Sequence, residues 1–199
     1  MSLLSTPAQP LVLIRSMGPA HRERVARHLL ALAPEDRYLR FGYAAGDAHI
    51  RRYVDGIKFG RDDVFGIVNR RLELLAMAHL AYADAAQRPS CAEFGVSVLR
   101  HVRGRGYGKR LFERAVIHAR NQGVEQLLIH ALTENKAMLS IAAGAGARLV
   151  RDGSETEALL QLPPANFDTL LGEVLQEQLA RSDYRWKRRV HMVRQWLSG

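Results

Sequence analysis

A basic, glycine-rich segment, Arg103–Lys109 (RGRGYGK), has the residue types most suited to chemistry in this sequence. It lies between an apolar run that ends near Leu99 and an amphipathic run that continues to Gln122. Glycines let the backbone turn sharply and approach a ligand closely. Successive N–H groups at a helix N-terminus hold an anion, most naturally a phosphate. The segment therefore predicts a phosphate-binding loop.

Two common phosphate loops do not fit this segment. A Walker A loop requires Gly-Lys followed by Ser or Thr, whereas Gly108 and Lys109 are followed by Arg110. The dinucleotide fingerprint requires glycine at its first, third and sixth positions, and the sixth position counted from Gly104 is Lys109. Both readings are excluded.

A third pattern, Arg/Gln-x-x-Gly-x-Gly/Ala, fits at every position, with Arg103, Gly106 and Gly108 in the defined places. This resembles the acetyl-CoA loop of the GNAT (Gcn5-related N-acetyltransferase) superfamily. The later run from Asn135 to Met138 is similar to that family's Asn-x-x-(Ala/Met) helix. Element order agrees over about residues 11–162, and motif-level likeness covers 93–150. The resemblance implies an α/β fold with a mixed sheet and an acyl-CoA N-acyltransferase function.

The same resemblance implies acetyl-CoA as co-substrate, with no metal. The loop N–H groups would hold its pyrophosphate, and the backbone of the preceding strand would hydrogen-bond its pantetheine arm. Asn135 would touch the cofactor from the following helix, although it suits a helix cap equally well. The expected cofactor-binding residues are Val96, Val98, Arg103, Gly104, Arg105, Gly106, Tyr107, Gly108, Lys109 and Asn135.

Acyl transfer to an amine requires a base, because an alkyl ammonium has a pKa of about 10.4. Relatives often use a glutamate on the strand before the loop, and Glu93 begins that strand here. This pattern resembles the protein-acetylating branch of the superfamily. Glu93 is therefore the predicted catalytic base; the other reading is an edge-strand glutamate that faces water.

Many relatives protonate the departing thiolate with a tyrosine, and that position is Ala142 here. The protein-acetylating branch tends to lack this tyrosine as well. A thiol of pKa about 8.5 also leaves fairly well without protonation. Histidine is a common acid–base residue, but neither His101 nor His130 is expected to be catalytic.

The segment Pro34–Phe41 is similar to the early helical segment of the same branch, which forms one wall of the acceptor site. Arg37, Tyr38, Arg40 and Phe41 are therefore candidate acceptor contacts. Tyr38 and Phe41 equally suit a role as core anchors.

Hydrophobic spacing and turn residues predict the elements that must position these groups. A domain at residues 1–162 is followed by a C-terminal helical extension at 163–199, after the Pro163-Pro164 stop. One βαβ crossover is expected near the centre. The expected strands are Pro10–Arg15, Val64–Asn69, Leu72–Tyr82, Cys91–Leu99, Gln126–Leu132, Arg148–Val150 and Glu157–Leu162, and the expected helices are one from Gly18-Pro19 to Pro34, Glu35–Phe41, one from Asp47, Gly106–Gln122, Thr133–Gly144 and Asn166–Leu197.

The extension is expected to break near Ser182-Asp183 and to carry an apolar face that includes Leu171 and Val174. Acidic residues lie in its first half and basic residues in its second half. This polarity suits antiparallel pairing with a second copy. Trp186 and Trp196 are costly to leave in water, so the extension is predicted to cover apolar surface at a homodimer contact.

Composition limits the classes of protein that remain. The 199 residues, 47% of them hydrophobic, exclude disorder, and no apolar run reaches the length of a membrane span. The single cysteine cannot form an internal disulfide, and a reducing cytoplasm is expected.

The net charge of +9 suggests an anionic partner, and residues 100–120 carry +6 of it. Three functions stay open: an N-acetyltransferase that acts on a small-molecule amine or a protein lysine, a catalytically silent acyl-CoA sensor, and a nucleic-acid-binding module. The last is disfavoured, because no recognition motif for nucleic acid is present.

Overall fold

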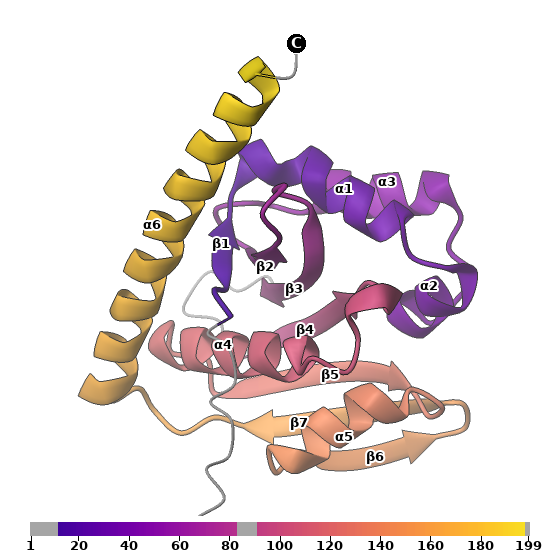
Figure 1. Cartoon of the computed structure of the whole chain (residues 1–199). Coiled ribbons are helices and arrows are strands. Elements are labelled where there is room, and N and C mark those ends of the chain that lie inside the picture. Colours follow the sequence, from indigo (N-terminus) through magenta and orange to yellow (C-terminus); the bar gives the residue numbers. More distant parts are fainter. Residues whose placement is uncertain (1–11, 83–90, 198–199) are drawn as a thin grey trace, which may run out of the picture.

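A seven-stranded mixed sheet organises the chain in a computed structural model, which describes residues 12–82 and 91–197, without the side chains of residues 167 and 185–197. The strand order is β1-β2-β3-β4-β5-β7-β6 (Figure 1). The strands are β1 Arg15–Met17, β2 Asp63–Val68, β3 Leu74–Tyr82, β4 Cys91–Val98, β5 Gln126–Leu132, β6 Arg148–Asp152 and β7 Glu155–Gln161. The helices are α1 Arg22–Leu30, α2 Pro34–Phe41, α3 Asp47–Gly56, α4 Tyr107–Asn121, α5 Lys136–Gly144 and α6 Phe167–Leu197, with short 3-10 turns at Pro19–His21 and Arg100–Val102.

One pair of neighbouring strands, β4 and β5, is parallel, and α4 connects them. The other described neighbours pair antiparallel. This confirms the predicted mixed α/β fold with a single central crossover, because parallel neighbours need such a connection whereas antiparallel ones can be joined by a turn.

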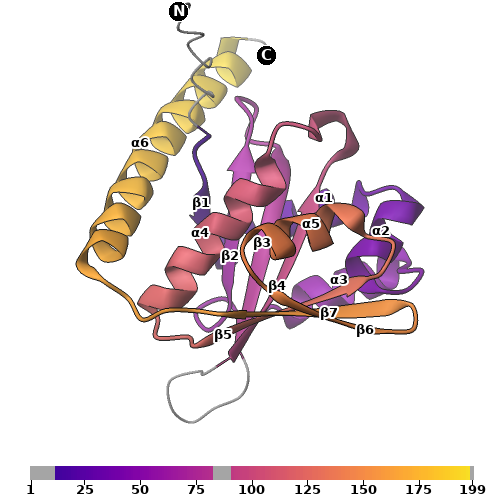
Figure 2. The same ribbon diagram turned by 90° about the horizontal axis from the view of Figure 1, so that it is seen from below.

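Helices cover both faces of the sheet, and each face has its own hydrophobic core. On one face, α4 and α5 bury residues such as Leu111 and Met138 against Phe94. On the other face, α1 and α3 bury Val25 and Ile50 against alternate residues of the same strands. Figure 2 shows α4 and α5 in front of the strands and α3 behind them. Because side chains alternate along a strand, β4 sends Phe94 to the first core and Gly95 to the opposite face.

The structure corrects several element predictions, among them the start of the helix predicted from Thr133, which begins at Lys136. The first strand lies at Arg15–Met17, later than Pro10–Arg15, because it is there that the chain pairs with β2. Pro34 begins α2, whose first turn carries two acidic residues and suits proline. The helix α6 is continuous through Ser182, whose hydroxyl donates to the Gln178 carbonyl at 3.0 Å, and has no break. The loop predicted at Gln87–Ser90 lies outside the described residues.

The helix α6 packs against the domain with its charged face. The Glu173 carboxylate accepts a hydrogen bond from Arg114 of α4 at 2.6 Å and contacts Nδ1 of His118. His118 Nε2 lies 2.8 Å from Asp63 of β2, which also accepts from the Tyr82 hydroxyl. A buried polar network therefore links α6 through α4 to the sheet.

The pKa values of His118 and Glu173 in this network are strongly shifted. Burial alone would lower the pKa of His118, but its hydrogen bonds to Asp63 and Glu173 outweigh burial and raise the pKa to about 9. Burial alone would raise the pKa of Glu173, but hydrogen bonds from His118 and Arg114 lower it to about 2. Near neutral pH the cluster therefore holds a charged histidine between two carboxylates.

Further along α6, polar contacts to β1 and α1 continue the same face. Glu177 accepts from the Ser16 hydroxyl at 2.8 Å, and Tyr184 stacks under the guanidinium of Arg15 and accepts from Arg24. Most of the described large apolar side chains of α6 lie outside this interface and are about half exposed. This outward face consists of Leu170, Leu171, Val174 and Leu175. Leu179 is also about half exposed, but it lines a groove with residues 12–14 and α4. The side chains of Trp186 and Trp196 lie outside the described part of the structure.

Among the helices of the described segments, including the long α6, none is both long and apolar enough to cross a bilayer.

We predict that Glu173→Gln lowers the free energy of unfolding by about 3 kcal/mol near pH 7, because it leaves the buried Arg114 without its nearest carboxylate. The wild-type protein should also lose stability as the pH rises from about 6.5 to about 9, since the raised pKa of His118 stabilises the fold only while that ring is protonated. The variant should lose less over this range. Urea unfolding at several pH values measures both effects.

The exposed Asp168→Asn on the first turn of α6 is the matched control and should change stability by less than about 1 kcal/mol. Equal stability of Glu173→Gln and this control would show that the network does not hold α6 to the domain.

Candidate functional site

The site begins where β4 and β5 separate. The two strands pair only from Cys91↔Gln126 to Glu93↔Leu128. Beyond that point β4 keeps pairing with β3 as far as Val98, and β5 keeps pairing with β7 as far as Leu132. A gap therefore opens between two otherwise continuous strands, and one edge of β4 has no strand partner after Glu93.

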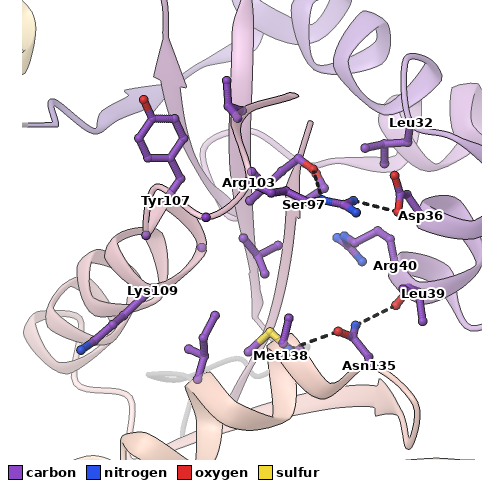
Figure 3. Close-up of a pocket in the computed structure, with 18 residues that line it drawn as sticks. Leu32, Asp36, Leu39, Arg40, Ser97, Arg103, Tyr107, Lys109, Asn135 and Met138 are labelled. Carbon is purple, nitrogen blue, oxygen red and sulfur yellow. Dashed lines mark hydrogen bonds and ion pairs between the residues drawn. The ribbon is translucent and has the colours of Figure 1, made fainter. Parts of the chain in front are cut away.

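A cavity of about 420 Å³ lies at the loop end of this gap (Figure 3). Four elements wall it: the end of β4, the glycine-rich loop with the start of α4, the start of α5, and α2. Its volume falls within the range typical of small-molecule and cofactor sites. The walls are mostly apolar around a few polar groups.

The loop has the backbone geometry of an anion site. Gly104 and Gly106 have φ values of +76° and +74°, which other residues rarely adopt. A Cβ at either position would meet open space. Gly106 is the N-cap of α4, and the N–H groups of Gly104–Lys109 donate to no carbonyl within the described chain. Several unspent donors therefore converge at a helix N-terminus.

Nine of the ten predicted cofactor-binding residues line this cavity, and Arg105, which is exposed, does not. The Lys109 side chain is 73% exposed and lies 3.8 Å from Glu113. In Figure 3 its amine points away from the cavity. Lys109 therefore contributes its backbone, and not its amine, to the wall of the cavity. The nine residues are Val96, Val98, Arg103, Gly104, Gly106, Tyr107, Gly108, Lys109 and Asn135.

Arg103 crosses the cavity and ties the loop to α2. Its guanidinium lies 2.8 Å from the Asp36 carboxylate, and its Nε donates to the Val98 carbonyl at 3.2 Å. Asp36 is almost completely buried, and Arg100 is its second cation at 3.8 Å. The sequence analysis did not find Asp36. An acidic residue in the first turn of a helix is common because it interacts favourably with the helix dipole. The local sequence therefore gave no indication that Asp36 pairs with the loop.

Asn135 is the N-cap of α5: its side-chain oxygen accepts from the Met138 N–H at 3.2 Å. Its amide nitrogen also donates to the Leu39 carbonyl of α2 at 3.3 Å. The sequence left two roles open for Asn135, a helix cap and a cofactor contact. The structure shows the helix cap, and Asn135 also lines the cavity.

A second cavity, of about 350 Å³, adjoins the first along the gap. Glu93, Gly95 and Val96 line it from β4, and Ile129–Leu132 line it from β5. Glu93 is exposed and stands at the point where the strands separate. Leu39, Arg40, Val96, Asn135 and Met138 line both cavities.

Beside Glu93 lies a row of polar side chains that the sequence analysis missed. The Tyr53 hydroxyl is 2.6 Å from Nδ1 of His79, and His79 Nε2 is 3.4 Å from Asp62. Arg40 donates to the same hydroxyl at 2.8 Å. Burial and the Arg40 charge lower the pKa of His79, so the ring is neutral and accepts the Tyr53 proton. Burial raises the pKa of Tyr53.

The signal for His79 was present in the sequence. It is the one polar residue in the apolar strand Leu74–Tyr82. Its register places it opposite Gly95 on β4. Tyr53 and Asp62 come from α3 and a loop, so only the fold brings them to it.

The other residues that the sequence suggested as site residues differ in whether they line a cavity. Phe41 packs on Tyr53 and lines the second cavity, whereas Tyr38 is exposed and lines neither. Arg37 is tied to Asp47 at 2.7 Å and does not face either cavity. His130 is exposed, lines the second cavity and lies 3.6 Å from Glu157.

Ala142 is completely buried and His101 is exposed, and neither lines a cavity. Within the described segments no group of three or more His, Cys, Asp or Glu residues is placed to hold a metal ion.

Comparison with known proteins agrees with this architecture. The sequence model of the acetyltransferase (GNAT) family matches residues 24–146. The solved GNAT domain of PAT from S. lividans is 20% identical, with a TM-score of 0.62 over 75% of this chain and 89% of that chain. An acetyltransferase of the GNAT family from Streptococcus pneumoniae is 12% identical, with a TM-score of 0.59 over 77% of this chain and 100% of that chain.

The cAMP-binding acyltransferase from Mycobacterium smegmatis is 19% identical, with a TM-score of 0.54 over 87% of this chain and 51% of that chain. The present chain therefore spans about half its length. No curated protein matches the chain in sequence. At these identities the solved structures show a shared fold, and the fold predicted from the sequence is confirmed.

We predict that Gly106→Val lowers the affinity for coenzyme A at least about tenfold, because a β-branched residue at this φ of +74° distorts the loop and its N–H groups. Isothermal titration with coenzyme A measures the effect. Gly153→Val is the matched control, since Gly153 has a φ of +56° in the turn between β6 and β7 and does not line the cavity. Undiminished affinity in Gly106→Val would place the phosphate site elsewhere.

Proposed function

This chain belongs to the GNAT acetyltransferase family, and we propose that it transfers an acetyl group from acetyl-CoA to a primary amine by direct attack on the thioester. The observation that carries this proposal is the separation of β4 from β5 after Glu93, with one cavity at the loop end of the gap and a second beside Glu93. Two substrates that enter these cavities would meet at β4.

The glycine-rich loop would hold the pyrophosphate of acetyl-CoA through its free N–H groups. The pantetheine arm would run along the unpaired edge of β4, beside Val96 and Val98. The Val98 carbonyl accepts from Arg103, so pantetheine would have to share or displace that contact. This arrangement directs the thioester toward Gly95 and the second cavity.

Glu93 would take the proton from the acceptor ammonium. It and Glu155 are the carboxylates that line the second cavity among the described residues, and Glu93 lies on β4 itself. The neutral amine then attacks the thioester carbonyl, a C–N bond forms, and the C–S bond breaks to release the coenzyme A thiolate. Ala142 cannot supply a proton, and a thiol of pKa about 8.5 leaves without one.

The proposal extends to a homodimer in which the outward face of α6 pairs with its copy. Four large apolar side chains on this face are about half exposed, and large exposed apolar patches mark interaction sites. The acidic first half and basic second half of α6 in sequence would oppose each other in an antiparallel pair. Figure 1 shows α6 as a rod along one edge of the domain, where a second helix can lie beside it.

We predict that the protein releases coenzyme A from acetyl-CoA when an acceptor amine is present, and that Glu93→Gln lowers this turnover by about 10² or more at neutral pH with coenzyme A affinity retained. Thiol release across a panel of amines and lysine peptides, with mass spectrometry of the products, measures it. Glu125→Gln, an exposed carboxylate at the opposite end of β5, is the control.

Binding of acetyl-CoA without turnover for any acceptor would identify a silent acyl-CoA sensor instead. Normal turnover of Glu93→Gln would move the base to another group.

We predict that the double substitution Leu171→Glu and Leu175→Glu lowers the assembly state to monomer, because it places four charges on a paired apolar face. Sedimentation velocity measures the mass. Truncation after Leu162 is a poorer test, since it would also unpair the buried Arg114. Leu149→Glu makes the same chemical change on the exposed strand β6 and should leave assembly unchanged. A wild-type protein that sediments as a monomer would contradict the dimer.

A further inference from the structure

Arg40 stands at the boundary between the two cavities. It lies near the end of α2 and lines both of them. Figure 3 shows its guanidinium reaching from α2 toward the centre of the site, between Asp36 and Asn135. In the function proposed above, this is where the thioester and the acceptor amine would meet.

The guanidinium lies directly over Gly95 of β4. A Cβ on Gly95 would be 2.4 Å from Nη2 and 2.8 Å from Nη1 of Arg40. Gly95 does not have a positive φ, so its backbone does not require glycine. The glycine is therefore needed for space: it lets the cation lie flat against the strand that would carry the thioester.

Neutral groups hold Arg40 in this place. It donates to the Tyr53 hydroxyl, which His79 fixes from the other side. The rings of Phe41 and Tyr53 lie 5.2 and 5.4 Å from its guanidinium carbon. The guanidinium is therefore oriented by Tyr53 and Phe41, by His79 through Tyr53, and by the strand below it.

No carboxylate lies within ion-pair distance of Arg40 in the described part of the chain, which sets it apart from its neighbours. Arg37 on the same helix pairs with Asp47, and Arg103 pairs with Asp36. A guanidinium has five N–H donors, and Arg40 spends one on Tyr53. A partly buried cation with unspent donors that faces a cavity is suited to bind an anion.

We propose that Arg40 binds a carboxylate of the substrates, and that this carboxylate belongs to the acceptor, which is then an amino acid or a similar amino carboxylate. The fork of N–H groups on arginine matches a carboxylate in two parallel hydrogen bonds. This inference rests on the acetyltransferase function proposed above and names its substrate class.

The spacing of charges favours the acceptor over the acyl chain as the source. Glu93 and Gly95 are two residues apart on one face of β4, which is about 7 Å. An acceptor with its amine at Glu93 would therefore place a carboxylate a few bonds away near Arg40. A carboxylate at the far end of an acyl chain, as in succinyl-CoA, has the same chemistry and is the second source to be tested.

The test compares wild type, Arg40→Gln, Arg40→Lys and the exposed control Arg51→Gln on α3. One arm measures kcat/KM with acetyl-CoA for amino acids against their amides. A second arm measures succinyl-CoA against acetyl-CoA with an uncharged amine. A third arm uses calorimetry to measure binding of N-acetyl amino acids and their amides, which needs no turnover.

We expect wild type to prefer the amino acid over its amide at least about 30-fold. This preference should be lost in Arg40→Gln, partly restored in Arg40→Lys and retained in Arg51→Gln. A preference for succinyl-CoA that depends on Arg40 would keep the carboxylate site and overturn its assignment to the acceptor. Turnover with no carboxylate preference in either arm would overturn the inference and leave the acetyltransferase function intact.

If no pair of substrates reacts, the proposed function fails, and the calorimetric arm then decides the inference. Arg40-dependent binding of the N-acetyl amino acid would support the carboxylate site. Equal binding of acid and amide, or no binding of either, would overturn it.

Discussion

The separation of β4 from β5 after Glu93 is the constraint on which the rest of the site depends. A buried strand normally pairs on both edges, because an unpaired backbone N–H or C=O away from water is costly. Here β4 stays paired with β3 while one edge turns toward two cavities. That free edge is tolerated because it faces space that a ligand or water enters. The loop, α2 and α5 are placed around it, and each supplies polar groups to the gap.

The helix α2 spans this gap and is held on both sides. Asp36 pairs with Arg103 of the loop, and the Leu39 carbonyl accepts from Asn135 of α5. These contacts link the two walls of the first cavity through one short helix, so its last turn can position Arg40 over Gly95. The residues that hold α2 and the residue that lies between the two cavities are therefore different. A displacement of α2 would therefore change the shape of both cavities at once.

The helix α6 reverses the usual relation between a helix and its domain. Amphipathic helices normally bury their apolar face, but α6 packs through Glu173, Glu177 and Tyr184 and leaves Leu170, Leu171, Val174 and Leu175 outward. A polar interface of this kind is specific because each carboxylate needs a fixed donor, and the charged His118 couples it to pH. The apolar face that remains outside is the observation on which the proposed homodimer rests.

The sequence by itself determined the element order, the parallel crossover, the glycine-rich loop before α4 and the place of Glu93, because periodicity, glycine positions and helix ends are local properties of the chain. It predicted a break in α6 near Ser182-Asp183 that the helix does not have. Helical spacing shows which residues share a face and does not show which face the domain accepts. Only the tertiary structure decided that Asp36 ties the loop to α2, that His79 holds Tyr53, and that Arg40 lies on Gly95. Those contacts join residues 13 to 67 positions apart, and their partners are chosen by strand register and helix packing, which no short segment encodes.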